Sequence, residues 1–338
     1  MVSKNRPVAL GVLSTASINE LVLAGVKASD HIKATAVASR DISKAENYAR
    51  KHEIEQAYGS YEELLYDPKI EAVYISLPNA MHIEWIVRAL EAGKHVLCEK
   101  PLSRHAEQVE RAYEVARDAK RVLMEGFMYR HHPQTRQIKS LVEEGAIGRL
   151  RMIRATFSFP QKDPTNVRMQ SRLNGGSLMD LGCYCVSGAR LLAGEPKHVV
   201  GEQLIGPTGV DVAFYSMLRF RDDVVALLDT SFVVPPRQSL EVFGEKGALI
   251  ARAPWRLDWG GSLELWRDEG VASLDVESVD SYRLEVENFA DAVRGKALPA
   301  LGKEDAIGQA RTIEALYRSA KGGHRVSLPA VDVTSAGD

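Results

Sequence analysis

The stretch Val96-Leu97-Cys98-Glu99-Lys100-Pro101 decides how this sequence of 338 residues is interpreted. Its first three residues are apolar and predict a short buried strand, which ends abruptly at a charged pair and a proline. Because proline fixes φ, it makes the end of this strand a stiff support for a reactive side chain. Lys100 is therefore the first candidate functional residue of the chain.

A regular alternation of strands and helices surrounds this stretch. The predicted strands are Val8–Leu13, Lys33–Ala38, Ala72–Leu77, His95–Leu97 and Val122–Met124. Helices are predicted between them, including Ser60–Tyr66, a helix from Pro78 to about Ala92, and Ser103–Ala119. Strands separated by helices form a parallel, doubly wound sheet with right-handed crossovers. We therefore predict an α/β fold, with a Rossmann-type dinucleotide-binding domain over residues 1–124.

The turn after the first strand carries a degraded glycine fingerprint. Gly11 is present, while Ser14 stands in the place of the second glycine and Ala16 in that of the third. A strand that turns into a helix leaves free backbone N–H groups and a partial positive charge, which suit a diphosphate. The motif alone is weak, because small residues follow many strands.

The end of the second strand indicates which dinucleotide is bound. An acid at this position bonds the ribose 2′-hydroxyl of NAD, whereas an arginine accommodates the 2′-phosphate of NADP. Here Ser39 and Arg40 come first, Asp41 follows, and Lys44 lies one helical turn further on. This order favours NADP. In the alternative interpretation Arg40 is a solvated turn residue and Asp41 caps the next helix, and the two interpretations are compatible.

His82 lies near the carboxyl end of the third predicted strand, where open α/β sheets bind their ligands. A cofactor contact and a capping or surface role are equally good interpretations of this residue.

After Gly148 the pattern changes to consecutive strands with short turns. They are Arg149–Phe159, His198–Leu204, Val212–Phe220, Val224–Phe232, Ser239–Phe243 and Ala248–Arg252, with helices at Gln134–Glu144, Tyr282–Arg294 and Glu304–Ala320. Such strands form a mostly antiparallel sheet. We predict a second, α+β domain over residues 125–338 that binds substrate and forms a homodimer or homotetramer through the open sheet.

A helical pattern after Gly175-Gly176 carries Asp180 and Tyr184, which share one helix face at i, i+4 spacing. Hydride transfer to or from an alcohol carbon needs a group that takes or gives the hydroxyl proton. A free phenol has a pKa of about 10, and a nearby ammonium lowers it. Our hypothesis is that Tyr184 is the acid/base, Lys100 its electrostatic partner, Asp180 an orienting residue and Glu99 the residue that positions Lys100. The alternative is a purely structural pair in which Asp180 satisfies a buried Tyr184.

Composition excludes several other classes. The formal net charge is −2 and charged residues are interspersed, whereas nucleic-acid binding needs clustered Lys and Arg. Three cysteines do not suggest a disulfide framework and favour a reducing, cytoplasmic compartment. Cys183 and Cys185 point to different sides of a helix, so we expect no metal site. No apolar run is long enough for a membrane helix.

These motifs resemble the Gfo/Idh/MocA oxidoreductase family along nearly the whole chain. The turn at Gly11–Ala16, the Glu99-Lys100-Pro101 element and the helix with Asp180 and Tyr184 occur in the family's order. Tyr184, where many members carry histidine, is similar to the branch with glucose–fructose oxidoreductase, NADP-dependent D-xylose dehydrogenases, dimeric dihydrodiol dehydrogenases and some nucleotide-sugar ketoreductases.

The resemblance implies a Lys–Tyr catalytic pair, bound NADP(H), a cis Lys100–Pro101 bond and dimerisation through the second domain's sheet. We expect an aldose 1-dehydrogenase of the D-xylose type. The alternatives are a nucleotide-linked deoxysugar ketoreductase, with Arg168, Arg172 and Arg237 as diphosphate ligands, or a trans-dihydrodiol dehydrogenase. A dinucleotide-binding sensor without turnover is the alternative of another class.

The residues predicted to contact the cofactor are Gly11, Ser14, Thr15, Ala16, Ser17, Ile18, Ser39, Arg40, Lys44, Leu77, Pro78, Asn79, His82, Glu99, Lys100, Met128 and Arg168. Those predicted to contact substrate are Lys100, Arg130, Phe159, Asp180 and Tyr184.

Overall fold

The computed structural model describes residues 6–329, which form two compact units. Unit 1 comprises residues 6–103, 107–132 and 278–307, and unit 2 comprises residues 104–106, 133–277 and 308–329. The chain therefore leaves unit 1, builds most of unit 2, returns to unit 1 over residues 278–307 and then re-enters unit 2. The functional division predicted at residue 124 stays a prediction.

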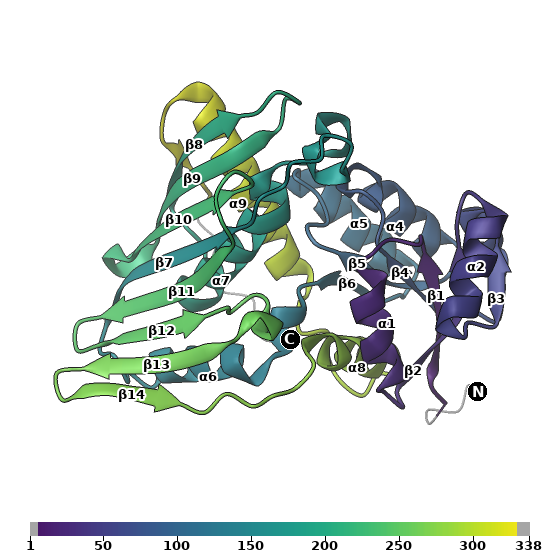
Figure 1. Ribbon diagram of the computed structural model, residues 1–338, viewed down its shortest axis with the longest axis horizontal. Helices are drawn as coiled ribbons and strands as arrows, with labels where there is room; N and C mark the ends of the chain where they lie inside the picture. Colours follow the sequence, from purple (N-terminus) through teal and green to yellow (C-terminus); the bar gives the residue numbers. More distant parts are fainter. Residues whose placement is uncertain (1–5, 330–338) are drawn as a thin grey trace. The chain divides into compact units, whose positions relative to one another are not determined.

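Unit 1 is built on a six-stranded sheet with the order β3-β2-β1-β4-β5-β6 (Figure 1), in which all neighbouring strands are parallel. The strands are β1 (Val8–Leu13), β2 (Ile32–Ala38), β3 (Gln56–Tyr58), β4 (Ala72–Ile75), β5 (His95–Glu99) and β6 (Leu123–Gly126). This confirms the predicted doubly wound sheet. Strand β3 was not predicted, because its three residues are too few to show a periodic pattern.

The helices of unit 1 follow the predicted alternation. They are α1 (Asn19–Lys27), α2 (Ile42–His52), α3 (Tyr61–Tyr66), α4 (His82–Glu91), most of α5 (Ala106–Asp118), and α8 (Ser281–Val293). Helix α8 comes from the C-terminal part of the chain and packs on α1, where Gly25 allows close approach. A Cβ at Gly25 would lie 2.7 Å from the backbone nitrogen of Arg283.

Unit 2 contains a nine-stranded sheet with the order β14-β13-β12-β11-β7-β10-β9-β8-β15. The strands are β7 (Leu150–Ser158), β8 (His198–Ile205), β9 (Asp211–Arg219), β10 (Val225–Ser231), β11 (Arg237–Gly244), β12 (Ala248–Arg252), β13 (Ser262–Arg267), β14 (Gly270–Leu274) and β15 (Val326–Ser327). Only β7 and β10 pair in parallel, which confirms the predicted mostly antiparallel sheet. The last three strands were not predicted. Strand β14 is exposed along most of its length, so it has no buried face to impose an alternating pattern.

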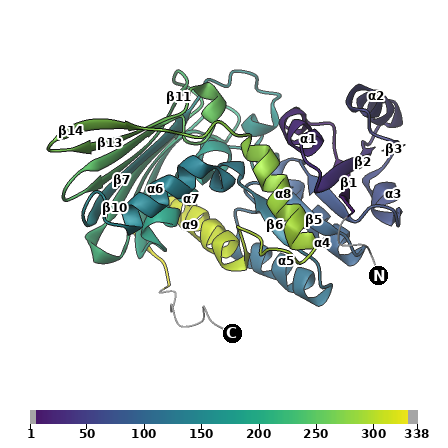
Figure 2. The same ribbon diagram turned by 90° about the horizontal axis from the view of Figure 1, so that it is seen from below.

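One face of this sheet is covered and the other is open. Helices α6 (Pro133–Glu143), α7 (Cys183–Ala193) and the unit 2 part of α9 (Lys303–Gly322) lie on one side of it (Figure 2). On the open face Tyr215, Met217 and Leu227 are 51%, 39% and 39% exposed. Within residues 6–329, no helix combines the length and apolar character needed to cross a bilayer.

Candidate active site

The turn between β1 and α1 adopts a conformation that normally requires glycine. Ser14 has a φ of 126°, which L side chains rarely adopt. This is the position where the fingerprint would carry its second glycine. The serine therefore keeps the glycine-like backbone, at a strain cost on the order of 1–3 kcal/mol.

Hydrogen bonds hold this turn in place. The Ser14 side-chain oxygen lies 2.8 Å from that of Ser76 and accepts from the backbone nitrogen of Ala16 at 3.1 Å. Asn19 donates from its side-chain amide to the Ser14 carbonyl at 2.9 Å. The N–H groups of Ser17 and Ile18 form no hydrogen bond with any residue that the structure describes. They remain available for an anion at the start of α1.

The carboxyl end of β2 combines both interpretations of its polar residues. Asp41 caps α2, because its Oδ1 accepts from the backbone nitrogens of Ser43 at 3.0 Å and Lys44 at 3.3 Å. The Asp41 carboxylate is therefore engaged by its own helix. Arg40 and Lys44 are exposed, while Ser39 is buried and accepts from the Asp41 nitrogen at 3.3 Å. Arg40 thus presents a cation at the edge of the sheet where a ribose 2′-substituent is expected.

His82 contacts two backbone carbonyls in the interior of unit 1 and does not face solvent, so the interpretation of a surface role is wrong. Its side chain is fully buried, with Nδ1 2.9 Å from the Pro101 carbonyl and Nε2 2.8 Å from the Leu77 carbonyl. Burial lowers its pKa, against the effect of these two hydrogen bonds. A cofactor contact by His82 stays a prediction, and both of its ring nitrogens are already engaged. Pro78 and Asn79, predicted cofactor neighbours, lie between β4 and α4, where Asn79 begins a short 3₁₀ turn.

The residues on both sides of Lys100 are fixed by hydrogen bonds within unit 1. The Lys100–Pro101 peptide bond is cis, as the resemblance implied. Glu99 accepts from the buried Tyr74 hydroxyl at 2.7 Å, and Glu125 accepts from the Leu102 nitrogen at 2.9 Å. Lys100 itself is half-buried. The strand end is therefore a rigid base for this side chain.

A buried carboxylic acid, Glu285, lies close to Glu99 at the end of β5. Glu285 of α8 is 1% exposed, and burial followed by the nearby charge of Glu99 raises its pKa well above the usual range. The same causes, burial first, raise the pKa of Tyr74. No local pattern predicts this cluster, because α8 joins unit 1 from a distant part of the chain.

In unit 2, Asp180 and Tyr184 lie on consecutive helical segments, where the sequence predicted one regular helix. Leu178–Gly182 forms a π-helical turn that carries Asp180, and α7 follows directly from Cys183. Gly182 permits this wide turn to pack, since a Cβ there would lie 2.7 Å from Leu178 Cδ1. π-Helical turns inside longer helices are rare and are often found at functional sites.

Aromatic rings surround Tyr184, which is 7% exposed. The ring of Phe157 lies edge-on at a centroid distance of 5.5 Å, and that of Trp255 lies tilted at 6.2 Å. One turn further along α7, Gly188 lets the same tryptophan approach the helix closely. A Cβ at this position would lie 2.7 Å from Trp255 Cη2. Phe157 and Trp255 were not among the predicted site residues, because no local motif connects them with Tyr184.

Asp180 forms an ion pair with Arg168, for which a different role was predicted. Arg168, predicted to contact the cofactor, donates from Nε to Asp180 Oδ2 at 2.6 Å. The Arg168 guanidinium carbon also lies 6.0 Å from the ring centre of Phe159. Unit 2 thus brings together three predicted substrate residues, Phe159, Asp180 and Tyr184, with Arg168 and Phe157 beside them.

Other predicted residues belong to unit 1. Arg130 is nearly buried and its Nη1 lies 3.4 Å from Asp305 Oδ1. Met128 is 3% exposed. Lys100 also belongs to unit 1 and Tyr184 to unit 2. Their action as a pair is therefore treated as a proposal below.

The arginine cluster suggested for a diphosphate does not form. Arg237 on β11 is paired with Ser158 of β7, and this face of the sheet is the open one that carries Arg154 and Glu241. Neighbouring residues of a strand point to opposite faces, so Arg237 and Phe157, the ring against Tyr184, lie on opposite faces. Arg172 donates to Gln170 at 2.9 Å.

The cysteines lie in surroundings that disfavour thiol chemistry. Cys98, Cys183 and Cys185 are all buried and free. Burial raises the pKa of Cys98 and of Cys185, which makes both thiols poor nucleophiles. Among the residues described, no three His, Cys, Asp or Glu side chains group as metal ligands would.

Two family models match this arrangement of a dinucleotide-type sheet followed by an open antiparallel sheet. The model for an oxidoreductase family with an NAD-binding Rossmann fold matches residues 11–127, and the GFO/IDH/MocA C-terminal domain matches residues 135–250. The chain belongs to the Gfo/Idh/MocA oxidoreductase family. Its known members therefore provide the relevant comparisons.

Two curated relatives that match over most of the chain are named for reactions of sugars or nucleotide-linked sugars. D-xylose 1-dehydrogenase (NADP(+)) 2 of Haloferax volcanii is 39% identical over 94% of this chain and 99% of its own. A dTDP-3,4-didehydro-2,6-dideoxy-α-D-glucose 3-reductase of Saccharopolyspora spinosa is 34% identical over 94% and 99%. Among solved structures, the Actinomadura kijaniata 3-ketoreductase KijD10 with NADP and TDP-benzene has a TM-score of 0.88 at 32% identity, over 93% and 98%.

Proposed function

We propose that this protein is an NADP(H)-dependent oxidoreductase for carbohydrates, most specifically an aldose 1-dehydrogenase of the D-xylose type. The observation that carries the proposal is the surroundings of Tyr184. Aromatic rings enclose this phenol one helical turn from the Arg168–Asp180 ion pair. The full-length match to a D-xylose 1-dehydrogenase supports the choice of substrate.

The residues of unit 1 fit the proposed cofactor. The free N–H groups of Ser17 and Ile18 would bind its diphosphate at the start of α1. Ser39 and the exposed Arg40 would hold a 2′-phosphate, since Asp41 is occupied as a helix cap. When bound, the cofactor supplies the ring carbon that gives or accepts a hydride.

The protein's own groups would move the proton. Tyr184 would take the proton of the sugar hydroxyl during oxidation and return it during reduction. The Lys100 ammonium would lower the pKa of that phenol and bind the reacting oxygen. Glu99, held by Tyr74, would position Lys100. Asp180, held by Arg168, would orient a second sugar hydroxyl.

Substitutions at Tyr184 and Lys100 test this assignment. We expect Tyr184→Phe and Lys100→Met each to lower kcat by about 10²- to 10⁴-fold, the usual contribution of general acid–base catalysis. The assay follows reduced nicotinamide by absorbance with NADP⁺ and D-xylose, D-glucose or related aldoses. Tyr66→Phe, at an exposed tyrosine of α3, and Lys139→Met, at an exposed lysine of α6, are matched controls. Near-native turnover of both active-site variants would exclude the pair.

A ketoreductase for nucleotide-linked deoxysugars is the second candidate, favoured by the match to the 3-reductase relative. NADPH-dependent reduction of a dTDP-linked keto-sugar, without turnover of free aldoses, would establish it. Turnover of a trans-dihydrodiol would instead select the diol dehydrogenase. Tight NADPH binding without turnover of any of these substrates would favour the sensor.

We also propose that copies of the chain associate through the open face of the nine-stranded sheet. This face exposes Tyr215, Met217 and Leu227 around a depression of about 500 Å³. Light scattering of the wild type and of Leu227→Arg would show whether the substitution lowers the assembly mass.

The three free cysteines accord with a reducing compartment, and we propose the cytoplasm.

A further inference from the structure

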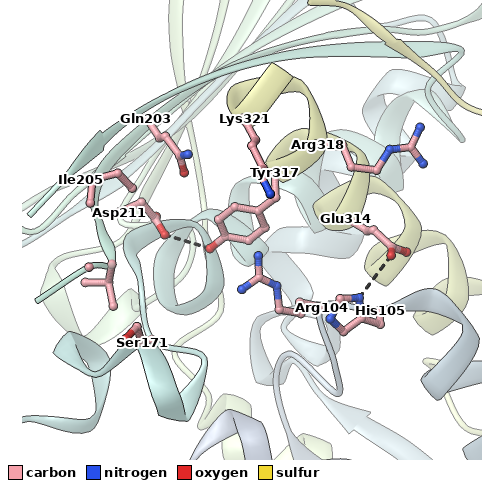
Figure 3. A pocket seen from close by; sticks show the side chains of 13 residues that line it. Arg104, His105, Ser171, Gln203, Ile205, Asp211, Glu314, Tyr317, Arg318 and Lys321 are labelled. Atoms are coloured by element: carbon pink, nitrogen blue, oxygen red, sulfur yellow. Dashed lines mark hydrogen bonds and ion pairs between the residues drawn. The ribbon is translucent and has the colours of Figure 1, made fainter. Parts of the chain in front are cut away.

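A buried carboxylate in unit 2 is bonded to the start of the helix that carries Asp180 and Tyr184. Asp211, the first residue of β9, is 3% exposed. Its Oδ2 accepts from the Leu178 backbone nitrogen at 2.7 Å and from the Ser177 hydroxyl at 2.9 Å. Its Oδ1 accepts from the Tyr317 hydroxyl at 2.9 Å, as Figure 3 shows.

The chain is shaped to receive this carboxylate. Gly176 has a φ of +124°, and a Cβ there would lie 2.1 Å from Asp211 Oδ1. The glycine is therefore required both by its backbone conformation and by the close approach of Asp211. The Gly176 carbonyl in turn accepts from the Asp180 nitrogen at 3.0 Å. The contact with Asp211 thus lies one turn before Asp180.

Asp211 takes the place of a local helix cap. Ser177 precedes the π-helical turn, but its side chain makes no capping hydrogen bond to that turn. Its hydroxyl donates to Asp211 instead and also lies 3.3 Å from the buried Thr230 hydroxyl. The first N–H groups of a helix need acceptors, and a carboxylate there is also favoured by the helix dipole. Strand β9 supplies that acceptor.

Tyr317 of α9 fixes the carboxylate from the other side, at a cavity of about 330 Å³. Burial and the nearby Asp211 raise the pKa of Tyr317 far above neutral pH, so its hydroxyl remains a donor. The guanidinium carbon of Arg104 lies 4.3 Å from the centre of the Tyr317 ring (Figure 3). Asp211, at the start of β9, is therefore held by α9 on one side and by the start of the helical segment that carries Asp180 and Tyr184 on the other.

We propose that Asp211 is a positioning residue for the proposed proton transfer: it fixes the π-helical turn, and thereby sets where Asp180 and Tyr184 lie. The inference rests on the proposed function. Asp211 itself need not touch substrate or cofactor. A displacement of about 1 Å at a reacting group can lower a rate about 100-fold, so the effect of losing Asp211 is expected in kcat.

Steady-state kinetics on two backgrounds test this role. We expect Asp211→Ala to lower kcat by about 10- to 100-fold, with Asp211→Asn retaining more activity because an amide still offers one acceptor. In a Tyr184→Phe background, where the positioned group is already lost, Asp211→Ala should lower the residual rate less than threefold, a non-additive result. NADPH affinity, measured by fluorescence, should stay within about twofold of the wild type, because its predicted ligands, Arg168 excepted, lie in unit 1.

Unchanged kcat in Asp211→Ala would overturn the inference. So would equal fold-losses on the two backgrounds, because these indicate a general structural effect. If Asp211→Ala does not fold, Ser177→Ala and Asp211→Asn carry the same test. A wild-type protein that binds NADPH but turns over no sugar defeats the proposed function first, and the positioning role with it. An active wild type whose variants keep kcat defeats the positioning role alone.

Discussion

Two turns of the molecule have nearly the same φ angle, but one leaves backbone N–H groups open and the other is filled by a carboxylate. Ser14, before α1 in unit 1, has a φ of 126°, and Gly176, before the π-helical turn in unit 2, has a φ of 124°. After Ser14 the N–H groups of Ser17 and Ile18 have no partner among the described residues. After Gly176 the Asp211 carboxylate already accepts from Leu178.

The difference separates two uses of a helix start. An open start can accept an anion from outside, because its N–H groups and dipole are free. A start filled by the protein's own carboxylate cannot, and it fixes the side chains that follow instead. We therefore interpret the turn of unit 1 as the place for a cofactor diphosphate. We interpret the turn of unit 2 as the element that fixes the positions of Asp180 and Tyr184.

Crowding the filled turn should have the largest effect. In Gly176→Ala the new methyl would lie 2.1 Å from Asp211 Oδ1, so the carboxylate must move as well as the backbone strain. We expect kcat to fall by about 100-fold or more, and the free energy of unfolding to fall by more than the roughly 1–3 kcal/mol of backbone strain alone.

Gly270→Ala is the matched control for this variant. Gly270 has a φ of +132° and open space around its Cβ position, so alanine there adds backbone strain without a collision. Thermal unfolding should therefore show the smaller loss of stability for Gly270→Ala, and kinetics should show a loss of kcat for Gly176→Ala alone. Equal kcat in both would mean that the filled turn does not set the geometry of Tyr184.

A negative charge in the open turn should have the next largest effect. Ser17→Asp gives the turn of unit 1 a carboxylate like the one that fills the turn of unit 2. It would repel a diphosphate and compete for the N–H groups, so we expect the Kd for NADPH to rise by about 10- to 100-fold. Ser17→Asn has nearly the same size without the charge and should bind much more tightly. Equal Kd values in a fluorescence titration would show that the diphosphate lies elsewhere.

The sequence predicted the open turn better than the filled one, for a physical reason. The strand, small residues and helix of unit 1 are contiguous, and so are Asp41 and the helix it caps, so their roles follow from local order. The filled turn depends on Asp211 and Tyr317, and the surroundings of Tyr184 depend on Phe157 and Trp255. These residues meet only through the folding of the sheet, which no local spacing encodes.

Ion pairs and the packing between distant helices could not be predicted from local order either. The sequence identified Arg168 and Asp180 as functional candidates but not as an ion pair, because both could serve a bound molecule equally well. It identified the helix of α8 but not its packing on α1, since the two helices are far apart in the chain and no local spacing encodes their contact. The predicted NADP preference from Ser39 and Arg40 needed neither kind of contact.

The smallest effect is expected at Ser14 itself, where conformation and side-chain bonding oppose each other. Both Ser14→Gly and Ser14→Ala lose the contacts with Ser76 and with the Ala16 nitrogen, but only glycine relieves the strain at a φ of 126°. We therefore expect the glycine variant to be more stable than the alanine variant by about 1–2 kcal/mol in urea unfolding of the cofactor-free protein. At Ser43, in the first turn of α2, the order should reverse by up to about 1 kcal/mol, because alanine is the better helix former. If alanine equals or exceeds glycine at residue 14, the serine is not strained, and its likeness to Gly176 is one of angle only.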